Sequence, residues 1–252
     1  MVTGNPSIRN FSGPFPDVPM SDAGVWLDDP TEVARPEHQL FLMQRALGFN
    51  CLDYSVVPAE ASLYRHQLPL REHIDSVCTD GLRLELAFPS CGNGSADSLD
   101  HSSHMAYPSL VQQGVCPAGY PILYPLLFFE TIYDTYAFKG QPGRFVLSYG
   151  DPVGTGYHGD FLMGWESAEL LQKAINECRA MSGHVGDCPH FKLQSDEQQQ
   201  HCRFPVPDIL NNDNPTGPRE GLAVDIPIQY GPQQATAYPV RLSSNTKHRQ
   251  LS

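Results

Sequence analysis

The sequence is poor in basic residues and contains no long apolar run. Lys and Arg number 16 against 28 Asp and Glu, which gives the 252 residues a formal net charge of -12. A phosphate backbone or an anionic membrane surface repels such a chain, so we expect neither nucleic acid nor membrane as a partner. No segment reaches the roughly 20 consecutive apolar residues of a transmembrane helix. A neutral glycan or small molecule fits this charge better.

Several signatures of common catalytic and binding classes are also missing. None of the seven cysteines forms the CxxC pair of zinc and thioredoxin-like proteins. The segment GDPVGTGYHGD has neither the GK[S/T] ending of a P-loop nor the spacing of GxGxxG, which argues against nucleotide binding. No GxSxG elbow is present, so the sequence gives no support to Ser-His-Asp hydrolysis.

The amino-terminal residues 1–6 lack the basic start and apolar run of a secretory signal peptide. The cysteines nevertheless favour a secreted ancestry, because their wide spacing between turn-rich segments is typical of disulfides. Two glycosylation sequons, Asn10-Phe11-Ser12 and Asn93-Gly94-Ser95, agree with a secreted glycoprotein. We expect secretion by ancestry, and a cytoplasmic protein if Met1 is the genuine start.

Loop lengths predict part of the disulfide pairing. We expect Cys91 to bond Cys116, and Cys178 to bond Cys188 or Cys202, because each pairing closes a loop of moderate length between adjacent elements. The number of cysteines is odd, which leaves a free thiol or a cysteine whose partner is not in this chain.

Composition and patterning favour an α+β fold, rich in β-structure, with a sandwich-like sheet, a few packed helices and long disulfide-tied loops. The 23 Pro and 21 Gly against only 17% charged residues indicate many turns. The length and hydrophobic content fit one large core, so we expect one domain over residues 1–232. Residues 233–252 are expected to form a flexible tail.

Two segments carry the strongest strand patterns. Alternating residues over 82–88 predict a strand with one buried face. Residues 126–136 are apolar on both faces at their start, which predicts a central strand with Glu130 deep inside. Shorter strands are expected at 7–9, 144–149, 223–230 and 238–242.

Two segments show helical spacing. Residues 36–48 carry a stripe of Leu40, Met43 and Leu47, with Pro36 suited to the first turn and Gly48 to the cap. Residues 167–181 are expected to start at a Ser167 cap and to pack on the sheet. Their apolar stripe is Leu171, Ala174, Ile175, Cys178 and Met181.

The loops after the apolar runs hold the densest group of histidine, tyrosine and acid. His101 and His104 are three residues apart and are followed by Tyr107, while His158 and Asp160 lie in a Gly-rich loop. Both loops are expected to leave the same rim of the sheet. We therefore expect the three histidines to line one pocket, with Asp160 or Tyr107 beside them.

The chemistry of that pocket stays open between three roles. His101, His104 and His158 can hold zinc, copper or manganese. Without a metal, these histidines can share acid-base catalysis with Tyr107 and a carboxylate, for which Asp160 and Glu130 are the candidates. The third role is structural, because loop histidines commonly hydrogen-bond the backbone.

Neighbouring residues also have structural interpretations. Glu130 can form an ion pair with Arg83 or Arg144 instead of acting on a substrate. Asp151 is expected to organise its turn. Exposed aromatic residues can stack on sugar rings, although packing in the core is their more common role. They are Tyr120, Tyr124, Tyr133, Tyr136, Tyr157 and Trp165.

Several long motifs follow one another in fixed order. They are GLRLELAFPSCGNG, DHSSHMAYPS, CPAGYPILYPLLFFETIYDT, FVLSYGDPVGTGYHGDFLMGW, LQKAINEC and GDCPHF. This series resembles a fungal secreted family, the domain of unknown function nineteen-ninety-six. The resemblance covers roughly residues 1–232. Because family members are often joined to WSC carbohydrate-binding modules, it implies secretion, disulfides and a fungal wall or polysaccharide setting. It implies no particular reaction.

The family pattern also includes a signal peptide and a further amino-terminal half with a Ser-Ser-His-x-His stretch, which this sequence lacks. A truncation, a mispredicted gene start and a re-purposed gene all explain the difference. Three functional hypotheses remain. They are a pocket that acts on or binds a carbohydrate or small molecule, a non-catalytic wall-associated module, and an enzyme recruited into a secondary-metabolite pathway.

Overall fold

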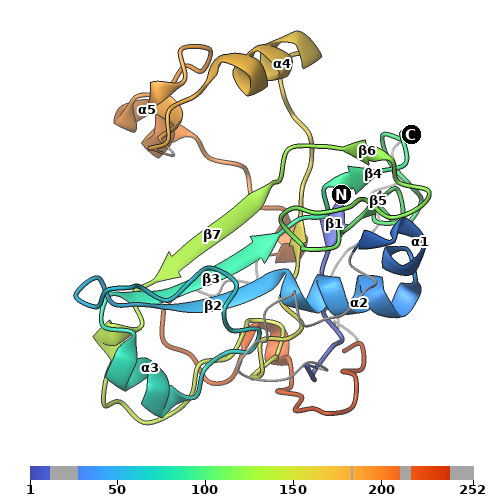
Figure 1. Cartoon of the computed structure of the whole chain (residues 1–252). Helices are drawn as coiled ribbons and strands as arrows, with labels where there is room; N and C mark the ends of the chain where they lie inside the picture. Colours follow the sequence, from blue (N-terminus) through green and yellow to red (C-terminus); the bar gives the residue numbers. More distant parts are fainter. Residues whose placement is uncertain (12–27, 183, 211–216, 239–252) are drawn as a thin grey trace, which may run out of the picture. The chain divides into compact units, whose positions relative to one another are not determined.

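The computed structural model describes residues 1–11, 28–182, 184–210 and 217–238, and the chain divides into two compact units. Unit 1 consists of Met1–Asp160 and Pro215–Ser252, and unit 2 of Phe161–Asn214. Each unit is described by itself (Figure 1). The predicted α+β class, with sheets, few helices and disulfide-tied loops, is confirmed.

All strands of the described residues belong to unit 1, and they form three small antiparallel sheets. The largest has the order β2-β3-β7 and the second the order β5-β4-β6, while β1 pairs with β8 (Figure 1). The bounds are β1 (Val2–Thr3), β2 (Leu47–Leu52), β3 (Gly81–Ala87), β4 (Cys91–Gly92), β5 (Met105–Ala106), β6 (Ile122–Leu123), β7 (Phe128–Tyr133) and β8 (Gly159–Asp160).

The strand predicted at 82–88 is confirmed as β3, but it is the central strand and is buried on both faces. A strand lies within the predicted range 126–136, but its predicted central place in the sheet was wrong. This strand, β7, is an edge strand whose residues are mostly exposed. The Glu130 side chain is 41% exposed and pairs with Arg83. The run of apolar residues therefore predicted a strand correctly but predicted its burial incorrectly.

The other predicted strands are not observed in the described residues. Residues 7–9 are irregular, and residues 144–149 contribute only an isolated bridge between Leu147 and Asp151. Within 223–230 the regular element is a short 3-10 helix, η6 (Ala223–Asp225). Of 238–242, Tyr238 is not in a strand and the rest lies outside the described residues.

The helices of unit 1 are α1 (Pro30–Val33), α2 (Pro36–Arg45) and α3 (Arg71–Val77), with the 3-10 turn η3 (Tyr136–Phe138). The predicted helix at 36–48 is confirmed as α2, with Pro36 in its first turn, but it ends earlier. Gly48 is in β2 and not at a cap. The position requires glycine because a Cβ there would lie 2.1 Å from a carboxylate oxygen of Glu85. Leu42 is the buried apolar residue of the helix and Leu40 is exposed, so the predicted stripe was misplaced.

Two hydrophobic clusters form the core of unit 1. On one face of the β2-β3-β7 sheet, Phe49, Leu82 and Leu84 pack with Ile74 and Cys78 of the α3 region. The second cluster joins α1 and α2 to the end of β3, and it consists of Val33, Leu42, Ala46, Ala87, Tyr107 and Val111. The sheet and helices are thus held by buried apolar surface, which is the main stabilising term in a domain of this size.

Three disulfides close loops in the chain. Cys91–Cys116 is confirmed, and Cys178 bonds Cys188. The bond Cys51–Cys78 joins β2 to the end of α3 and was not predicted. Cys202 is an exposed free thiol, which is one of the two outcomes expected for an odd cysteine.

A buried ion pair fixes the carboxyl-terminal part of unit 1. The Arg9 Nε lies 3.6 Å from Asp151 Oδ1, and both side chains are almost fully buried. Asp151 also accepts the backbone N–H groups of Val153, Gly154 and Gly156, so its predicted role in the turn is confirmed. Arg9 Nε donates to the carbonyl of Gln229.

The predicted domain end at residue 232 stays a prediction. The predicted flexible tail starts at 233, where residues 233–238 are described and belong to unit 1. Ala235 N–H donates to the carbonyl of Ser7 at 2.8 Å, and Thr236 N–H donates to the Gln229 side chain. Residues 239–252 lie outside the described residues.

Unit 2 contains α4 (Ala168–Glu177), α5 (Asp196–His201) and the 3-10 turns η4 (Val185–Asp187) and η5 (Asp208–Leu210). The predicted helix at 167–181 is confirmed as α4, with the Ser167 hydroxyl accepting the N–H of Leu170. It ends at Cys178, and of its predicted stripe only Ala174 is buried while Met181 is fully exposed. Among the described residues, no helix has the length and apolar character needed to cross a membrane.

Candidate functional site

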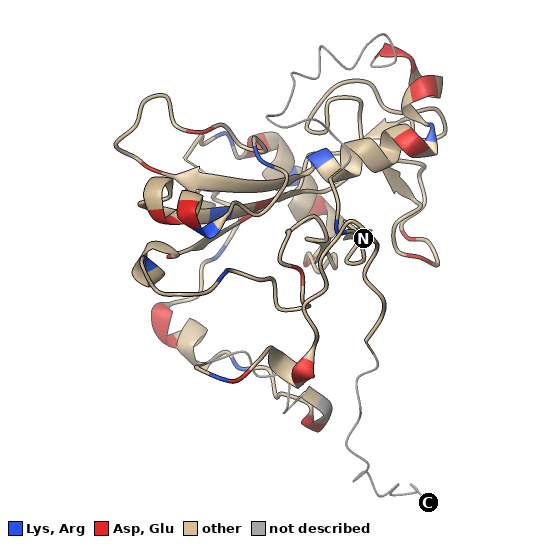
Figure 2. Cartoon of the chain, turned by 90° about the horizontal axis from the view of Figure 1, so that it is seen from below, with Lys and Arg blue, Asp and Glu red and all other residues tan. Residues whose placement is uncertain are grey.

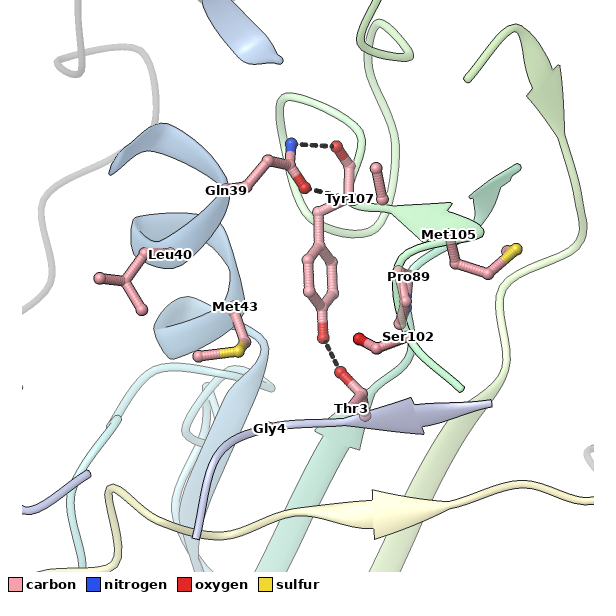
Figure 3. Close-up of a pocket in the computed structure, with 10 residues that line it drawn as sticks. Thr3, Gly4, Gln39, Leu40, Met43, Pro89, Ser102, Met105 and Tyr107 are labelled. Carbon is pink, nitrogen blue, oxygen red and sulfur yellow. Dashed lines mark hydrogen bonds between the residues drawn. The ribbon is translucent and has the colours of Figure 1, made fainter. Parts of the chain in front are cut away.

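A pocket of about 190 Å³ lies beside Tyr107 in unit 1 (Figure 3). Its walls come from α2, which supplies Leu40 and Met43, from Thr3 of β1, and from the segment between Ser102 and Tyr107. We call it the Tyr107 pocket. Its lining includes one predicted site residue, Tyr107, and none of the three histidines.

Tyr107 itself is held in place by every polar atom it has. Its hydroxyl donates to the carbonyl of Ala87 at 3.0 Å and is in short contact with the hydroxyl of Thr3, which is therefore the donor in that pair. Burial raises the pKa of the Tyr107 hydroxyl well above its ordinary value. Tyr107 therefore stays protonated and cannot serve as a general base near neutral pH.

Gln39 clamps the backbone of Tyr107 from α2. The Gln39 Nε2 donates to the Tyr107 carbonyl at 3.0 Å, and the Tyr107 N–H donates to the Gln39 Oε1 at 2.8 Å. Figure 3 shows the amide facing the tyrosine backbone while the ring points toward Thr3. Sequence reasoning missed Gln39 and Thr3, because they are 68 and 104 residues from Tyr107 and carry no local motif.

The loop that carries His101 and His104 is organised by Asp100. The Asp100 Oδ1 accepts the backbone N–H groups of Ser102 and Ser103 at 3.1 and 2.9 Å and the hydroxyl of Ser98. These donors hold the pKa of the Asp100 carboxyl far below its usual range. The loop is thus stabilised by an ionised carboxylate, and Ser102 is presented to the Tyr107 pocket.

The two histidines of this loop have different partners. His104 is buried, and its Nδ1 lies 2.9 Å from the Ser98 hydroxyl. His101 is exposed, and its Nδ1 lies 2.9 Å from the Asp97 carboxylate. That imidazole lowers the pKa of Asp97. His104 therefore supports the loop, whereas His101 forms a surface dyad with its Nε2 open.

His158 and Asp160 approach the same region through β1. Val2 pairs with Asp160 in the β1-β8 ladder, and the Val2 N–H donates to the carbonyl of His101 at 2.7 Å. The backbones of the two predicted loops are therefore joined by one short strand. Among the described residues, the His158 side chain shares no partner with His101 or His104, because its Nδ1 hydrogen-bonds the Gly156 carbonyl and its ring lies against Tyr149.

The three-histidine metal site has no ligand cluster in this arrangement. Within the described ranges, no three side chains of His, Cys, Asp or Glu gather closely enough to hold a metal ion. His101, His104 and His158 each take a separate partner. Their assignment as metal ligands stays a prediction that these contacts do not favour.

Glu130 belongs to a network of charged side chains on β3 and β7. Arg83 lies 2.8 Å from the Glu85 carboxylate and 3.0 Å from that of Glu130. Glu85 also accepts the N–H of Leu63, and burial raises the pKa of Glu85 above its ordinary value. The predicted pairing of Glu130 with Arg83 is confirmed, and the network does not include the Tyr107 pocket lining.

Most of the aromatic residues considered for sugar stacking are exposed, so their expected burial was wrong. Tyr124, Tyr133, Tyr136 and Trp165 are exposed, and Tyr120 and Tyr157 are intermediate. Trp165 stacks on Phe191 within unit 2 at a centroid distance of 5.7 Å. Aromatic surface is therefore available outside the pocket as well.

Charged groups are spread over the described chain without a basic stripe. Figure 2 shows Lys and Arg residues as separate single positions among more frequent Asp and Glu. The absence of nucleic acid and membrane partners stays a prediction. No charged side chain lines the Tyr107 pocket.

Comparison with known proteins identifies the family of the chain. Searches against curated proteins and against solved structures give no match. The family described as Domain of unknown function (DUF1996) matches residues 1–165, which include the Tyr107 pocket and all six predicted site residues. The motifs LQKAINEC and GDCPHF lie beyond the matched residues. The match covers well over half of the sequence, so the chain belongs to this family of unknown function.

Proposed function

We propose that this protein binds a small neutral molecule with one apolar face, such as a single sugar unit of a glycan, in the Tyr107 pocket. The observation that carries the proposal is a lining without charge that combines apolar walls, Met43, Pro89 and Met105, with the hydroxyls of Thr3 and Ser102. A sugar ring offers the same combination of C–H surface and hydroxyl groups.

Size supports a ligand no larger than one ring. Pockets for drug-sized ligands measure roughly 300–1,000 Å³, whereas this pocket measures about 190 Å³. Secretion and attachment to a fungal wall polysaccharide belong to the same proposal, since the pocket then holds one unit or end of a longer chain.

Binding without catalysis is the simpler function for this pocket. The Tyr107 hydroxyl and the Gln39 amide are both committed to internal hydrogen bonds. Of the hydroxyls that line the pocket, that of Ser102 makes no hydrogen bond to the described residues. A serine hydroxyl that is not hydrogen-bonded to a base is a weak nucleophile and a weak acid.

The test is saturation-transfer NMR with a panel of neutral monosaccharides, together with glucuronic acid and glucosamine as charged counterparts. We expect at least one neutral sugar to bind and its charged counterpart to bind at least tenfold more weakly. Ser102→Trp should abolish binding by filling the pocket, whereas Ser95→Trp, at an exposed serine outside the lining, should not. If no neutral sugar binds, or if Ser102→Trp binds as wild type does, the proposal fails.

One observation favours a second candidate, an acid-base enzyme. The Asp97–His101 dyad orients an imidazole whose Nε2 is open, and His101 is next to Ser102 in the chain. A carboxylate that holds Nδ1–H leaves Nε2 as the proton acceptor. Turnover of a bound sugar derivative that is lost in His101→Gln, with binding retained, would establish this candidate over the first.

A further inference from the structure

β7 is the free edge of the largest sheet, and its outward backbone groups have no partner among the described residues. Phe88 N–H donates to the carbonyl of Leu127. Antiparallel pairs alternate between bonded and non-bonded, so Phe129, Thr131 and Tyr133 turn their backbone groups to β3. Phe128, Glu130 and Ile132 therefore point their N–H and C=O groups away from the sheet.

The usual protections of an edge strand are missing from β7. It contains no Lys, no Pro and no bulge in its six-residue pairing with β3. Its apolar side chains are instead largely exposed, with Ile132 at 57% and Tyr133 at 53%. An exposed apolar edge of this kind is a template for another strand.

The one carboxylate of β7 does not prevent a second strand from docking. Glu130 is paired within its own chain with Arg83 at 3.0 Å. The edge therefore presents little net charge, although the whole chain is strongly acidic. We propose that the occupant of this edge is a second copy of the same chain, which pairs through β7 in an antiparallel, two-fold arrangement centred on Thr131.

Charge and side-chain pairing select this register. A pairing centred on Glu130 puts two carboxylates opposite each other, and one centred on Ile132 puts Glu130 opposite Asp134. Centred on Thr131, Phe129 of one copy faces Tyr133 of the other, and the two Thr131 residues face each other. Aromatic pairs and Thr–Thr pairs are among the favourable cross-strand combinations. The two three-stranded sheets then form one continuous sheet with closed two-fold symmetry.

The net charge of -12 on each copy sets the salt dependence. Long-range repulsion opposes association at low ionic strength, and salt screens it. Dimerisation should therefore strengthen as sodium chloride rises from about 20 to about 300 mM, opposite to an interface held by ion pairs between copies. Sedimentation velocity over a concentration series measures this.

Single cysteine substitutions in β7 test the register of the pairing between the two copies directly. In a Cys202→Ser background, Thr131→Cys places two thiols at a non-hydrogen-bonded pair with Cα atoms about 4.5 Å apart, within disulfide reach. We expect a disulfide-linked dimer after incubation in a glutathione redox buffer. The matched control Ile132→Cys, also at an exposed position of β7, faces Glu130 of the other copy and should stay unlinked.

A second variant tests the outer edge of β7 without removing its hydrogen bonds to β3. Ile132→Pro deletes an outward N–H and leaves the bonds to β3 in place. It should weaken dimerisation at least tenfold while the circular dichroism spectrum stays unchanged. A wild-type chain that remains monomeric at millimolar concentration and high salt, or crosslinking that prefers position 132 over 131, overturns the proposal.

Discussion

The two compact units of the chain are stabilised in different ways. Unit 1 has two buried apolar clusters, three sheets and two disulfides. Among the described residues of unit 2, only Ala174 and Cys188 are buried, and the helices are held by caps and one disulfide. The matched family residues end at 165, close to the boundary between the units. The family match therefore covers the two apolar clusters of unit 1, whereas unit 2 depends on local interactions.

The largest expected effect comes from removing core volume in unit 1. Phe49→Ala should cost about 3–5 kcal/mol, because a fully buried ring is lost from the cluster of Phe49, Leu82 and Ile74. Ile175→Ala, at an exposed position of α4, should cost less than about 0.5 kcal/mol. Hydrogen exchange of β3 and α4 amides measures each unit separately. Equal losses in the two variants would erase the contrast between the units.

The next effect is the loss of the disulfide in unit 2. Replacing Cys178 and Cys188 by serine opens a loop with a sequence separation of 10. The loop-entropy relation gives about 2–3 kcal/mol for a loop of this size. We expect α4 amides to lose protection while β3 amides keep theirs. Protection that persists in α4 would mean that packing, and not the cross-link, holds unit 2.

The smallest effect is a pH dependence that belongs to unit 1. Burial raises the pKa of Glu85, so the folded state holds the proton more tightly than the unfolded state. That contribution to stability is present below the unfolded pKa of about 4.3 and is lost as pH rises through the folded value. From pH 4 to 7, wild type should therefore lose stability relative to Glu85→Gln.

Glu177→Gln supplies the matched control for that titration. Glu177 pairs with His190 in unit 2, and its carboxylate is 59% exposed. Exposed pairs contribute little to stability, so urea melts of this variant should follow wild type across the same pH range. A steeper change for Glu177→Gln than for Glu85→Gln would reverse the assignment.

Sequence patterns predicted elements better than their surroundings. The alternation over 82–88 identified β3, because Leu82, Leu84 and Leu86 share one face. It predicted an exposed second face, which is in fact covered by the loop that donates the Leu63 N–H to Glu85. A charged residue in an alternating pattern indicates solvent unless its partners are known, and one partner of Glu85, the Leu63 N–H, lies in a distant loop.

β2 and the Tyr107 pocket show the same limit. Gly48 favoured a helix end, yet its lack of a Cβ makes room for Glu85 in the neighbouring strand. Asn50 lies buried in the same strand, where its amide donates to the backbone carbonyls of Glu60 and Ala61. The backbones of the two predicted loops both contact β1, but the contacts of Tyr107 with Gln39 and Thr3 depend on long-range packing that spacing does not reveal.

The contact of Arg9 with Gln229 can form only late in synthesis of the chain. The Arg9 guanidinium completes unit 1 by donating to the carbonyl of Gln229, 220 residues further along the chain. Ribosomes add about 5–20 residues per second, so roughly 10–40 s pass between the two residues. Unit 2 is made within that interval. During this interval the nascent unit 1 lacks the hydrogen bond between Arg9 and Gln229. A chain that is truncated before Gln229 cannot form this bond at all.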